Sequence, residues 1–391
     1  MYNVFDYVAE FGDKTFAEMP FNDVDAIALC NDMYMWVQLV VTRELQAPED
    51  AMTLRESNEL LMDKFHGEYV GFGLAMNKEV PIGYDKLAKT NRYGDIKITG
   101  VRNEYDMDEH LQYCAITLHL DDERLMVIYR GTDDSIAGWI EDADILVKGE
   151  IPSYKLSVDY LNEVADTYPD KKIIVGGHSK GGNVSLYAAL NCRDDVRARF
   201  QYVYNNDGPG FANYDMFKTR AYQDILPVYR HIIPYNSFVG MMLCHDDDYL
   251  IINSSFSVGA AQHSSESWQF KGAELDLMDD LGTEGKINKR SFEELGENID
   301  VDELNAVYGI LLAMTEGMAQ PGLIGIAKNL PSSVSEAIRA YRNSSPEDKE
   351  GFKRGVAKFG KIVRSSVREI VGKERQASRR GRRAKAQASE E

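Results

Sequence analysis

One stretch, residues 171–190, constrains the fold of this chain more than any other part of its sequence. It reads KKIIVGGHSKGGNVSLYAAL, which is a β-branched run, a glycine-rich turn and then apolar residues at helical spacing. The turn at residues 177–181, GHSKG, fits the G-x-S-x-G pattern in which a serine lies between a strand and a helix. The two glycines let strand and helix pass closely. We therefore expect a buried strand, Ser179 on a sharp turn, and a helix whose first N–H groups lie near the serine.

Strands and helical segments alternate along the middle of the chain. Strands are expected at residues 96–99, 113–120, 124–129, 173–175, 201–205, 228–233 and 249–253. Helices are expected at residues 154–168, 184–190, 211–222 and 238–244. This alternation implies right-handed crossovers and a mainly parallel sheet flanked by helices, which is an α/β fold.

Five regions follow from pattern and composition. They are a helical N-terminal layer or lid (1–75), the α/β core (76–272), a helical extension (273–344), a basic amphipathic helix (345–375) and a disordered basic tail (376–391). Within the extension, helices are expected at residues 291–318 and 334–341. The basic helix has a good start at Ser345, Pro346 and Glu347. The tail lacks apolar periodicity, which favours disorder.

Charge is distributed unevenly along the chain. The formal net charge is −19, but residues 353–385 contain thirteen Lys or Arg and two acidic residues. A basic amphipathic helix is typical of segments that lie on anionic membranes, so we expect a peripheral membrane contact through residues 345–385. The alternative is a solvated helix and tail that fold against the acidic body. Nucleic acid could contact the basic cluster at residues 379–385, but it is not the partner that we expect.

Cysteine usage and the N-terminus bear on the location of the protein. The four cysteines form no C-x-x-C pair, and the first residues lack a basic start followed by an apolar core. Both features predict a reduced, cytoplasmic protein. The longest apolar stretch, residues 308–327, is interrupted by polar residues and is too polar to span a bilayer comfortably. The sequence has no convincing metal-ligand spacing, phosphate loop or dinucleotide fingerprint, so no cofactor is expected.

A nucleophilic serine needs a histidine as general base. In the chain order serine, acid, histidine, only His231, His245 and His263 come late enough. His231 begins an apolar strand and His245 lies in an acidic run. His263 follows the last predicted strand, and a loop after the final strand is where such a fold delivers its histidine, so His263 is the favoured base.

Two places offer the acid that would orient the histidine. Asp207 ends the strand after the serine strand and opens a DGPG turn. A buried carboxylate there would accept the imidazole N–H and hold its tautomer. Asp246, Asp247 and Asp248 are the alternative, one strand further on. Asp207 is favoured, although an Asx turn before Pro209 and a solvated acidic run are simpler explanations of the two places.

Two N–H groups are needed to hold the oxyanion that forms during ester cleavage. The backbone N–H of Lys180, directly after the nucleophile, is one. The loop at residues 130–133, RGTD, follows an earlier strand and supplies the other from Thr132, whose hydroxyl could also contribute.

These motifs resemble the α/β-hydrolase superfamily and, within it, the class 3 (fungal-type) lipases. The F-R-G-T and D-W-L-x-D patterns of those lipases appear here as YRGT at 129–132 and GWIED at 138–142, and their G-H-S-L-G-G elbow appears as GHSKGG at 177–182. The chain is still more similar to a bacterial subfamily of lipase-like hydrolases known as a domain of unknown function. FDYV, DGPGF, SFVGMML and QHSSESW carry that similarity, which spans residues 3–272.

Two departures from the class 3 pattern matter. Those lipases carry their acid in an N-x-x-D-x-V-P turn, and the matching residues 233–238, IPYNSF, have Ser237 instead. This favours Asp207, whose turn is similar to the D-P-A-G-P turn of pancreatic-type lipases. Lys180 replaces an apolar residue, and its side chain is expected to add a cation beside the site.

The resemblance and the motifs together predict a serine hydrolase. It would cleave a carboxylic ester of an acyl or lipid-like substrate through an acyl-enzyme on Ser179, with a Ser-His-Asp triad. The alternative is a catalytically silent binding or scaffolding protein that keeps the fold, because fold does not determine function.

Overall fold

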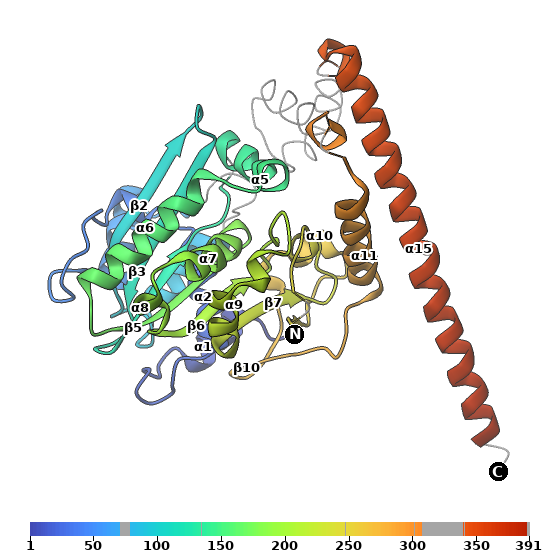
Figure 1. The fold of residues 1–391 in the computed structure, drawn as a ribbon. Helices are drawn as coiled ribbons and strands as arrows, with labels where there is room; N and C mark the ends of the chain where they lie inside the picture. The colour runs from blue at the N-terminus through green and yellow to red at the C-terminus, as the bar shows by residue number, and fades with distance from the viewer. Residues whose placement is uncertain are drawn as a thin grey trace.

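A computed structural model describes residues 1–70, 79–133, 135–246, 248–300, 302–306, 339 and 341–388. Its centre is an eight-stranded sheet in the order β1 to β8 (Figure 1). The strands are β1 (Met52–Thr53), β2 (Lys97–Asp106), β3 (Leu111–His119), β4 (Arg124–Tyr129), β5 (Lys172–His178), β6 (Phe200–Asn206), β7 (Tyr229–Pro234) and β8 (Leu250–Ile252). Strands β1 to β4 pair antiparallel, and β4 to β8 pair parallel. The predicted α/β-hydrolase fold is confirmed.

Helices cover both faces of the sheet. One face carries α5 (Ile136–Lys148), α6 (Pro152–Thr167), α7 (Lys180–Asn191), α8 (Asp194–Arg197) and α9 (Arg220–Ile225), and the other carries α1 (Val4–Phe11), α2 (Asp23–Asp32), α3 (Leu54–Lys64) and α4 (Glu79–Ala88). Because successive side chains of a strand point to opposite faces of the sheet, alternate residues pack into two different hydrophobic cores. In β5, Ile173 and Val175 pack with Val184 of α7, whereas Ile174 packs with Ile27 of α2. Burial on both faces explains the unbroken β-branched run in the sequence.

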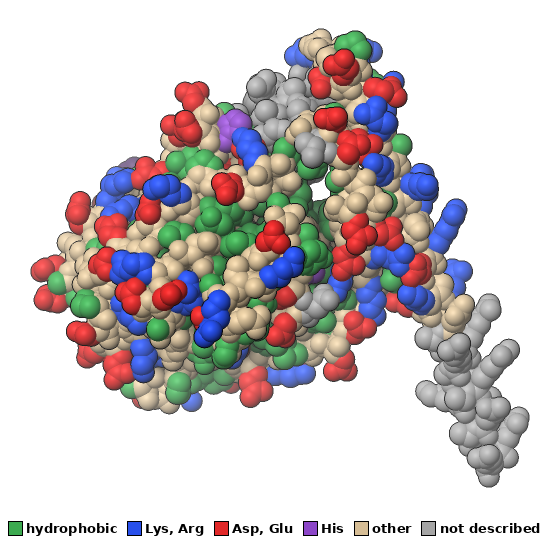
Figure 2. All heavy atoms as spheres, viewed as in Figure 1, with side chains coloured by type: hydrophobic (Ala, Val, Ile, Leu, Met, Phe, Trp, Pro, Cys, Tyr) green, Lys and Arg blue, Asp and Glu red, His purple; other side chains and the backbone are tan. Residues whose placement is uncertain are grey.

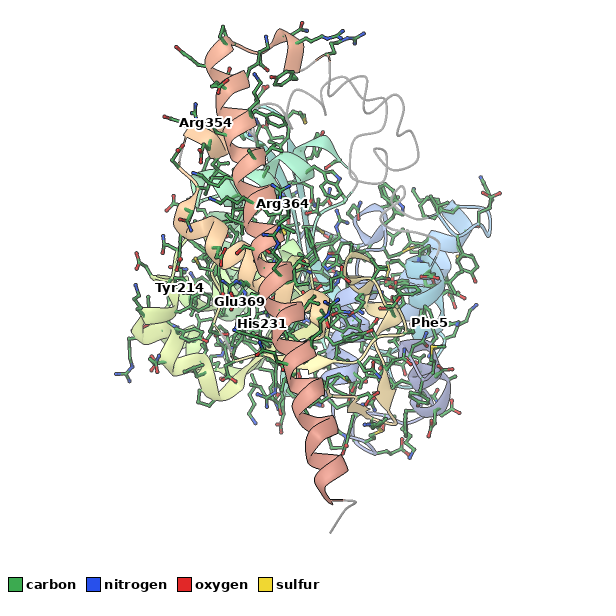
Figure 3. All side chains as sticks on the ribbon, turned by 90° about the vertical axis from the view of Figure 1, so that its right-hand side faces the viewer. Phe5, Tyr214, His231, Arg354, Arg364 and Glu369 are labelled. Carbon is green, nitrogen blue, oxygen red and sulfur yellow. The ribbon has the colours of Figure 1, made fainter. Side chains whose placement is uncertain are left out.

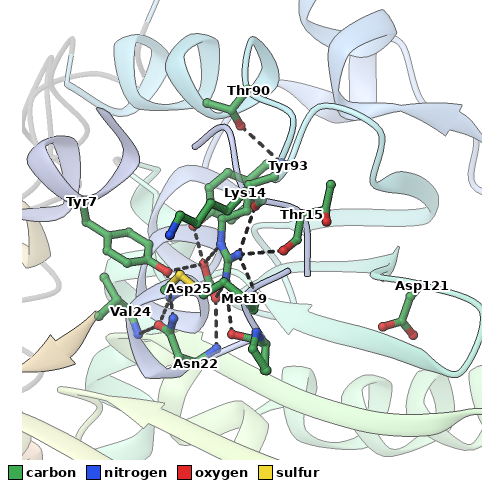
Figure 4. Close-up of polar contacts among 12 residues, drawn as sticks. Tyr7, Lys14, Thr15, Met19, Asn22, Val24, Asp25, Thr90, Tyr93 and Asp121 are labelled. Atoms are coloured by element: carbon green, nitrogen blue, oxygen red, sulfur yellow. Dashed lines mark hydrogen bonds and ion pairs between the residues drawn. The ribbon is translucent and has the colours of Figure 1, made fainter. Parts of the chain in front are cut away.

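A buried ion pair ties the N-terminal layer together (Figure 4). Arg92 binds Asp25 of α2 through two hydrogen bonds, Nε to Oδ1 at 2.7 Å and Nη2 to Oδ2 at 2.5 Å, and both side chains are fully buried. The hydroxyls of Tyr7 and Tyr93 donate to the same carboxylate, at 3.0 and 2.5 Å. The other guanidinium N–H groups bind backbone carbonyls in the α1–α2 connection, including Met19 at 3.0 Å. Hydrogen bonds within the protein therefore replace the hydrogen bonds to water that both side chains lose on burial.

Two predicted helices and part of the N-terminal layer differ from the structure. Residues 238–244 form only a short 3-10 helix, η4 (Val239–Met241), because the N–H of Gly240 is directed to Asp207 and Ser237, and Cys244 pairs with Phe211. Residues 211–222 form η2 (Met216–Lys218) and the beginning of α9. In the N-terminal layer, which the sequence predicts to be helical, α2 ends at Asp32, and Val37–Leu39 form the 3-10 helix η1.

The C-terminal part of the chain is helical where it is described. Helix α11 (Thr283–Asn298) begins eight residues before the predicted Ser291, and the predicted helix at 334–341 lies almost wholly outside the described residues. Helix α15 (Pro346–Ala388) continues past residue 375, into the segment predicted to be disordered. Ala, Arg, Lys and Gln dominate that segment and are all strong helix formers, which explains the difference. Within the described residues, no helix is both long enough and apolar enough to cross a lipid bilayer.

We predict that Arg92→Met lowers the free energy of unfolding by about 3–5 kcal/mol, because it leaves the buried Asp25 carboxylate without its cation. Urea unfolding of both proteins measures the difference. Arg43→Met is the matched control, because Arg43 pairs with Glu104 at 2.5 Å while 59% of its side chain is exposed. That change should cost less than about 1 kcal/mol. Equal effects of the two substitutions would contradict the role given to burial.

Candidate active site

Ser179 lies on a strained turn between β5 and α7. Its φ and ψ angles are 59° and −134°, a conformation that costs a non-glycine residue about 1–3 kcal/mol. A Cβ atom at Gly177 would lie 2.3 Å from the backbone of Gly181, and one at Gly181 would lie 2.1 Å from the carbonyl oxygen of Tyr129. The two glycines are therefore required by the close approach of strand and helix. The strained serine at the N-terminus of α7 is the geometry of a nucleophile elbow.

The loop after β4 passes beside the serine. A Cβ atom at Gly131 would lie 3.2 Å from Ser179 Cβ and 2.0 Å from the hydroxyl oxygen of Tyr34. The Tyr34 hydroxyl donates to the carbonyl oxygen of His178 at 3.0 Å, so a side chain from the N-terminal layer closes the turn from the far side of the sheet. The backbone of this loop therefore lies close to both Ser179 and the first turn of α7.

His263 and Asp207 are brought together by different parts of the chain. His263 follows α10 (Gly259–Gln262), and its Nδ1 lies 2.7 Å from Oδ2 of Asp207. Asp207 is fully buried, whereas 24% of the His263 side chain is exposed. Because the carboxylate accepts the proton on Nδ1, the Nε2 atom of a neutral ring is left free to accept a proton. Among the described residues, none forms a hydrogen bond with the Ser179 hydroxyl, a contact that in unliganded enzymes is often long.

The sheet itself fixes Ser179 and Asp207 at one edge. Strands β5 and β6 run parallel, and their last paired residues are His178 and Asn206. Ser179 directly follows β5 and Asp207 directly follows β6, so the two residues lie side by side. The N–H of Ser179 donates to the carbonyl oxygen of Asn206 at 3.0 Å. Asp207 then turns away with a positive φ of 50°, and its N–H donates to Ile232 of β7 at 2.8 Å.

Asp207 has further donors that hold its carboxylate. Its Oδ1 accepts from the Ser237 hydroxyl at 2.5 Å and from the N–H of Gly240 at 3.2 Å. With the His263 contact on Oδ2, both oxygens are occupied, which fixes the plane of the carboxylate toward the ring. Ser237 is thus a site residue that the sequence analysis noted only as a departure from the class 3 pattern. The sequence did contain a signal for this role, because a small residue with a hydroxyl group occupies the turn in which the class 3 pattern places its acid.

The ring of His263 is also positioned by its contact with His178. It stacks on the ring of His178, with centroids 4.6 Å apart, and the carbonyl oxygen of His263 accepts from His178 Nε2 at 2.8 Å. Burial, together with the neighbouring charge of His263, lowers the pKa of His178 to about 3, so His178 stays neutral. Trp268 holds the same loop, because its indole N–H donates to the carbonyl oxygen of Gln262 at 2.8 Å.

The hydroxyl of Thr132 is already engaged. It donates to Asp142 of α5, with oxygen–oxygen distances of 2.8 and 2.7 Å. A hydroxyl has one proton, so while it binds Asp142 the backbone N–H of Thr132 is the donor left for an oxyanion. Burial raises the pKa of Asp142 to about 6, against the opposing effects of Lys180 and the Thr132 hydroxyl.

The side chain of Lys180 does not lie in the site as a free cation, in contrast to our expectation. Its Nζ is buried and pairs with Oε2 of Glu141 at 2.6 Å, and it also donates to the carbonyl and side-chain oxygens of Gln112 at 2.8 and 2.9 Å. Glu141 is fully buried and accepts from Ser153 Oγ at 2.6 Å. The pair fixes the side chain of Lys180 to α5, and Lys180 is the residue that directly follows Ser179.

The alternative base and acids lie elsewhere. His231 is buried on β7, and Asp246 Oδ1 lies 3.8 Å from its Nδ1. Burial, with the nearby His245, lowers the pKa of His231 to about 3. The His245 ring contacts the backbone carbonyl of Asp246 at 2.8 Å. Asp248 is exposed, and Asp247 lies outside the described residues.

Other features of the described residues do not join this site. A cavity of about 680 Å³ is lined by residues of the loop that follows η1, of β1 and of α3, among them Val40, Met52 and Leu60, and by none of the predicted site residues. In the part of the chain that the structure describes, no three His, Cys, Asp or Glu side chains are grouped so that they could hold a metal ion.

One family model and several solved structures match this chain. A model of the Mbeg1-like family matches residues 87–313. The native Rhizomucor miehei lipase in complex with its propeptide is 15% identical, with 57% of this chain and 79% of that chain covered and a TM-score of 0.34. The M37 lipase is 16% identical, with 47% and 68% covered and a TM-score of 0.30. Similarities of this degree carry no inference about activity. No curated protein gives a significant match.

The raised pKa of Asp142 predicts how stability changes with pH. Between about pH 4 and pH 6 the folded protein holds this proton more tightly than the unfolded chain, so the stabilisation present at low pH is lost as the pH rises through 6. Asp142→Asn removes that loss. We expect the stability of Asp142→Asn relative to wild type to increase by about 3 kcal/mol from pH 4 to pH 7, measured by urea unfolding. A difference that stays constant with pH would contradict a raised pKa of Asp142 in the folded protein.

The Lys180–Glu141 pair predicts strongly non-additive substitutions. Lys180→Met should lower the free energy of unfolding by about 3–5 kcal/mol, because Glu141 is left buried without its cation. Adding Glu141→Gln removes the uncompensated charge, and the amide oxygen still accepts from Ser153. The double variant should therefore regain most of the loss in urea unfolding. Additive losses in the double variant would show that packing, rather than charge, is the dominant effect.

Proposed function

The chain belongs to the Mbeg1-like family, and from the arrangement of Ser179, His263 and Asp207 we propose that it is a serine hydrolase that cleaves a carboxylic ester. The observation that carries the proposal is the 2.7 Å contact between His263 Nδ1 and the buried Asp207 carboxylate. It occurs at the sheet edge where Ser179 follows β5. A strained serine, a partly exposed histidine and a buried acid are the parts that nucleophilic ester cleavage needs.

In the proposed first step, the Ser179 hydroxyl oxygen attacks the ester carbonyl carbon and gives its proton to His263 Nε2. Asp207 stabilises the imidazolium through the proton on Nδ1. The tetrahedral intermediate collapses when the bond to the alcohol oxygen breaks, and His263 returns the proton to that leaving oxygen. The products of this step are the free alcohol and an acyl ester on Ser179.

The second step is the same chemistry with water. His263 takes a proton from a water molecule, whose oxygen attacks the acyl carbon, and the acid leaves as Ser179 regains its proton. In both steps the oxyanion is held by the N–H groups of Lys180 and Thr132. The contacts of Glu141 with Lys180 and of Asp142 with Thr132 support this assignment, because each acid holds one of the two donor residues in place.

Exposed apolar side chains near His263 favour an acyl or lipid-like substrate. Phe256 and Val258 lie on the segment that leads to His263, with 48% and 58% exposed, and Phe238 follows Ser237 with 36% exposed. Asn236 Nδ2 donates to the carbonyl oxygen of Ser257 at 3.3 Å, so the two segments lie side by side. Apolar surface beside a catalytic histidine would bind the hydrocarbon part of a substrate.

The test is hydrolysis of p-nitrophenyl esters of increasing chain length. Ser179→Ala, His263→Ala and Asp207→Asn should each lower kcat by roughly 10⁴–10⁶-fold, because the three residues act as one catalytic unit. His245→Ala and Asp246→Asn are matched controls from the alternative positions and should retain activity. Wild type should also react with a fluorophosphonate probe, and Ser179→Ala should not.

Two outcomes would overturn the proposal. Folded wild-type protein that neither cleaves any ester nor reacts with the probe would indicate a catalytically silent binding or scaffolding protein. Activity lost in Asp246→Asn but kept in Asp207→Asn would assign the acid to the other place.

A further inference from the structure

Helix α15 is attached to the body along one face only. Its residues Gly355, Ile362 and Ser366 recur at helical spacing and are buried. They face α11, where Phe292 and Phe359 have ring centroids 6.4 Å apart. Polar contacts reinforce the attachment, because Arg290 of α11 pairs with Glu369, and the Thr283 hydroxyl donates to Glu374 at 2.9 Å. The orientation of α15 on the body is therefore determined by packing.

The outer face of α15 is a row of cations. Lys361, Arg364, Arg368 and Arg375 recur at spacings of three, four and seven residues, so they lie on one side of the helix. All four are exposed, and among the described residues none of them has an acidic partner. Figure 2 shows Lys and Arg side chains along the outer edge of this helix, and Figure 3 shows Arg354 and Arg364 on a helix that lies in front of the body.

An apolar strip runs between the cationic row and the attached face. It consists of Val356, Phe359, Val363 and Val367, at spacings of three and four residues. Val356 is 49% exposed, Phe359 37% and Val367 39%. Apolar side chains at this spacing would normally be covered by a neighbouring element, and no described segment covers them fully.

We propose that α15 binds the surface of an anionic lipid bilayer, with the strip at Val356, Phe359 and Val367 inserted between headgroups and the row from Lys361 to Arg375 against lipid phosphates. An interfacial helix needs an apolar side and adjacent cations, and α15 has both on the part that the body leaves open. The charges are also complementary: a chain with 63 acidic and 44 basic residues would be repelled by such a surface except at this helix.

A lipid surface explains the exposed apolar strip better than the two other candidate partners, nucleic acid and the acidic body of the protein. Nucleic acid would use the cations but not the exposed valines and phenylalanine. The acidic body would use the cations as well, but the four outer residues have no acidic partner among the described residues. A bilayer is the one surface that satisfies the cationic row and the apolar strip together.

The docked helix would also bring the candidate active site to the bilayer, a point that rests on the proposed function. A row of aromatic rings links the two places. Phe359 of α15 contacts Phe292, and Phe292 contacts Phe238 with centroids 5.3 Å apart. Phe238 follows Ser237, the hydroxyl donor to Asp207. The exposed apolar side chains beside His263 would then face the same surface.

Co-sedimentation of the full chain with vesicles tests the proposal. We expect binding to vesicles that contain phosphatidylglycerol, little binding to phosphatidylcholine alone, and release by salt. Each cation near such a surface contributes roughly a fivefold gain in affinity, so Arg364→Glu with Arg368→Glu should weaken binding at least about 25-fold. Val356→Ser with Val367→Ser should also weaken it, without a change in net charge.

The matched control is Lys172→Glu with Lys218→Glu. It changes the net charge by the same amount at body positions that are 63% and 71% exposed, and it should leave binding within about twofold. Equal losses in the control and in the α15 variant would overturn the proposal, as would binding of DNA in place of vesicles. The serine variant separates the two proposals. Ser179→Ala should bind vesicles like wild type, whether or not the protein proves to be a hydrolase.

Discussion

The close contact between β5 and α7 is the constraint on which the rest of the site depends. Gly177 and Gly181 let the two backbones meet, and the turn between them then holds Ser179 in a conformation that its own side chain disfavours. Such strain persists only where the surroundings determine the backbone. Here they do so from both sides of the sheet: the N–H of Ser179 binds β6, and Tyr34 of the N-terminal layer binds the carbonyl oxygen of His178.

Three carboxylates do most of the positioning around this turn, and of these Asp207 and Glu141 are fully buried while Asp142 is partly buried. Asp207 holds His263, Asp142 holds Thr132 and Glu141 holds Lys180, and each joins segments that are distant in the sequence or on different elements. A buried charge is costly unless it is fully paired, so loss of the partner of Asp207 or of Glu141 would strongly destabilise the fold. Because Glu141 and Asp142 are consecutive on α5, one helix controls both residues whose N–H groups are assigned to the oxyanion. A movement of α5 would disturb both donors at once.

The sequence was sufficient for features that depend on neighbouring residues. The β-branched run, the two glycines and the helical spacing after them predicted β5, the turn and α7, because sterics act locally there. The helix expected at residues 238–244 was wrong, since Gly240 donates its N–H to Asp207, a residue more than thirty positions away. The partners of Lys180 and Thr132 could not be found from spacing either. Glu141 and Asp142 looked like part of a motif, and their roles depend on how α5 lies on the sheet.

In the proposed triad, Ser237 explains why the acid can come from the end of either of two strands. This chain resembles the class 3 lipases, whose pattern places a carboxylate in the turn that corresponds to the one after β7. In this chain that position is Ser237. The Ser237 hydroxyl is 2.5 Å from Asp207 Oδ1, so the ends of β6 and β7 converge on one point beside His263. A carboxylate from either strand could reach that point, but two would repel each other in a buried site. When Asp207 supplies the acid, the other position is best filled by a small donor, and a serine hydroxyl meets that requirement.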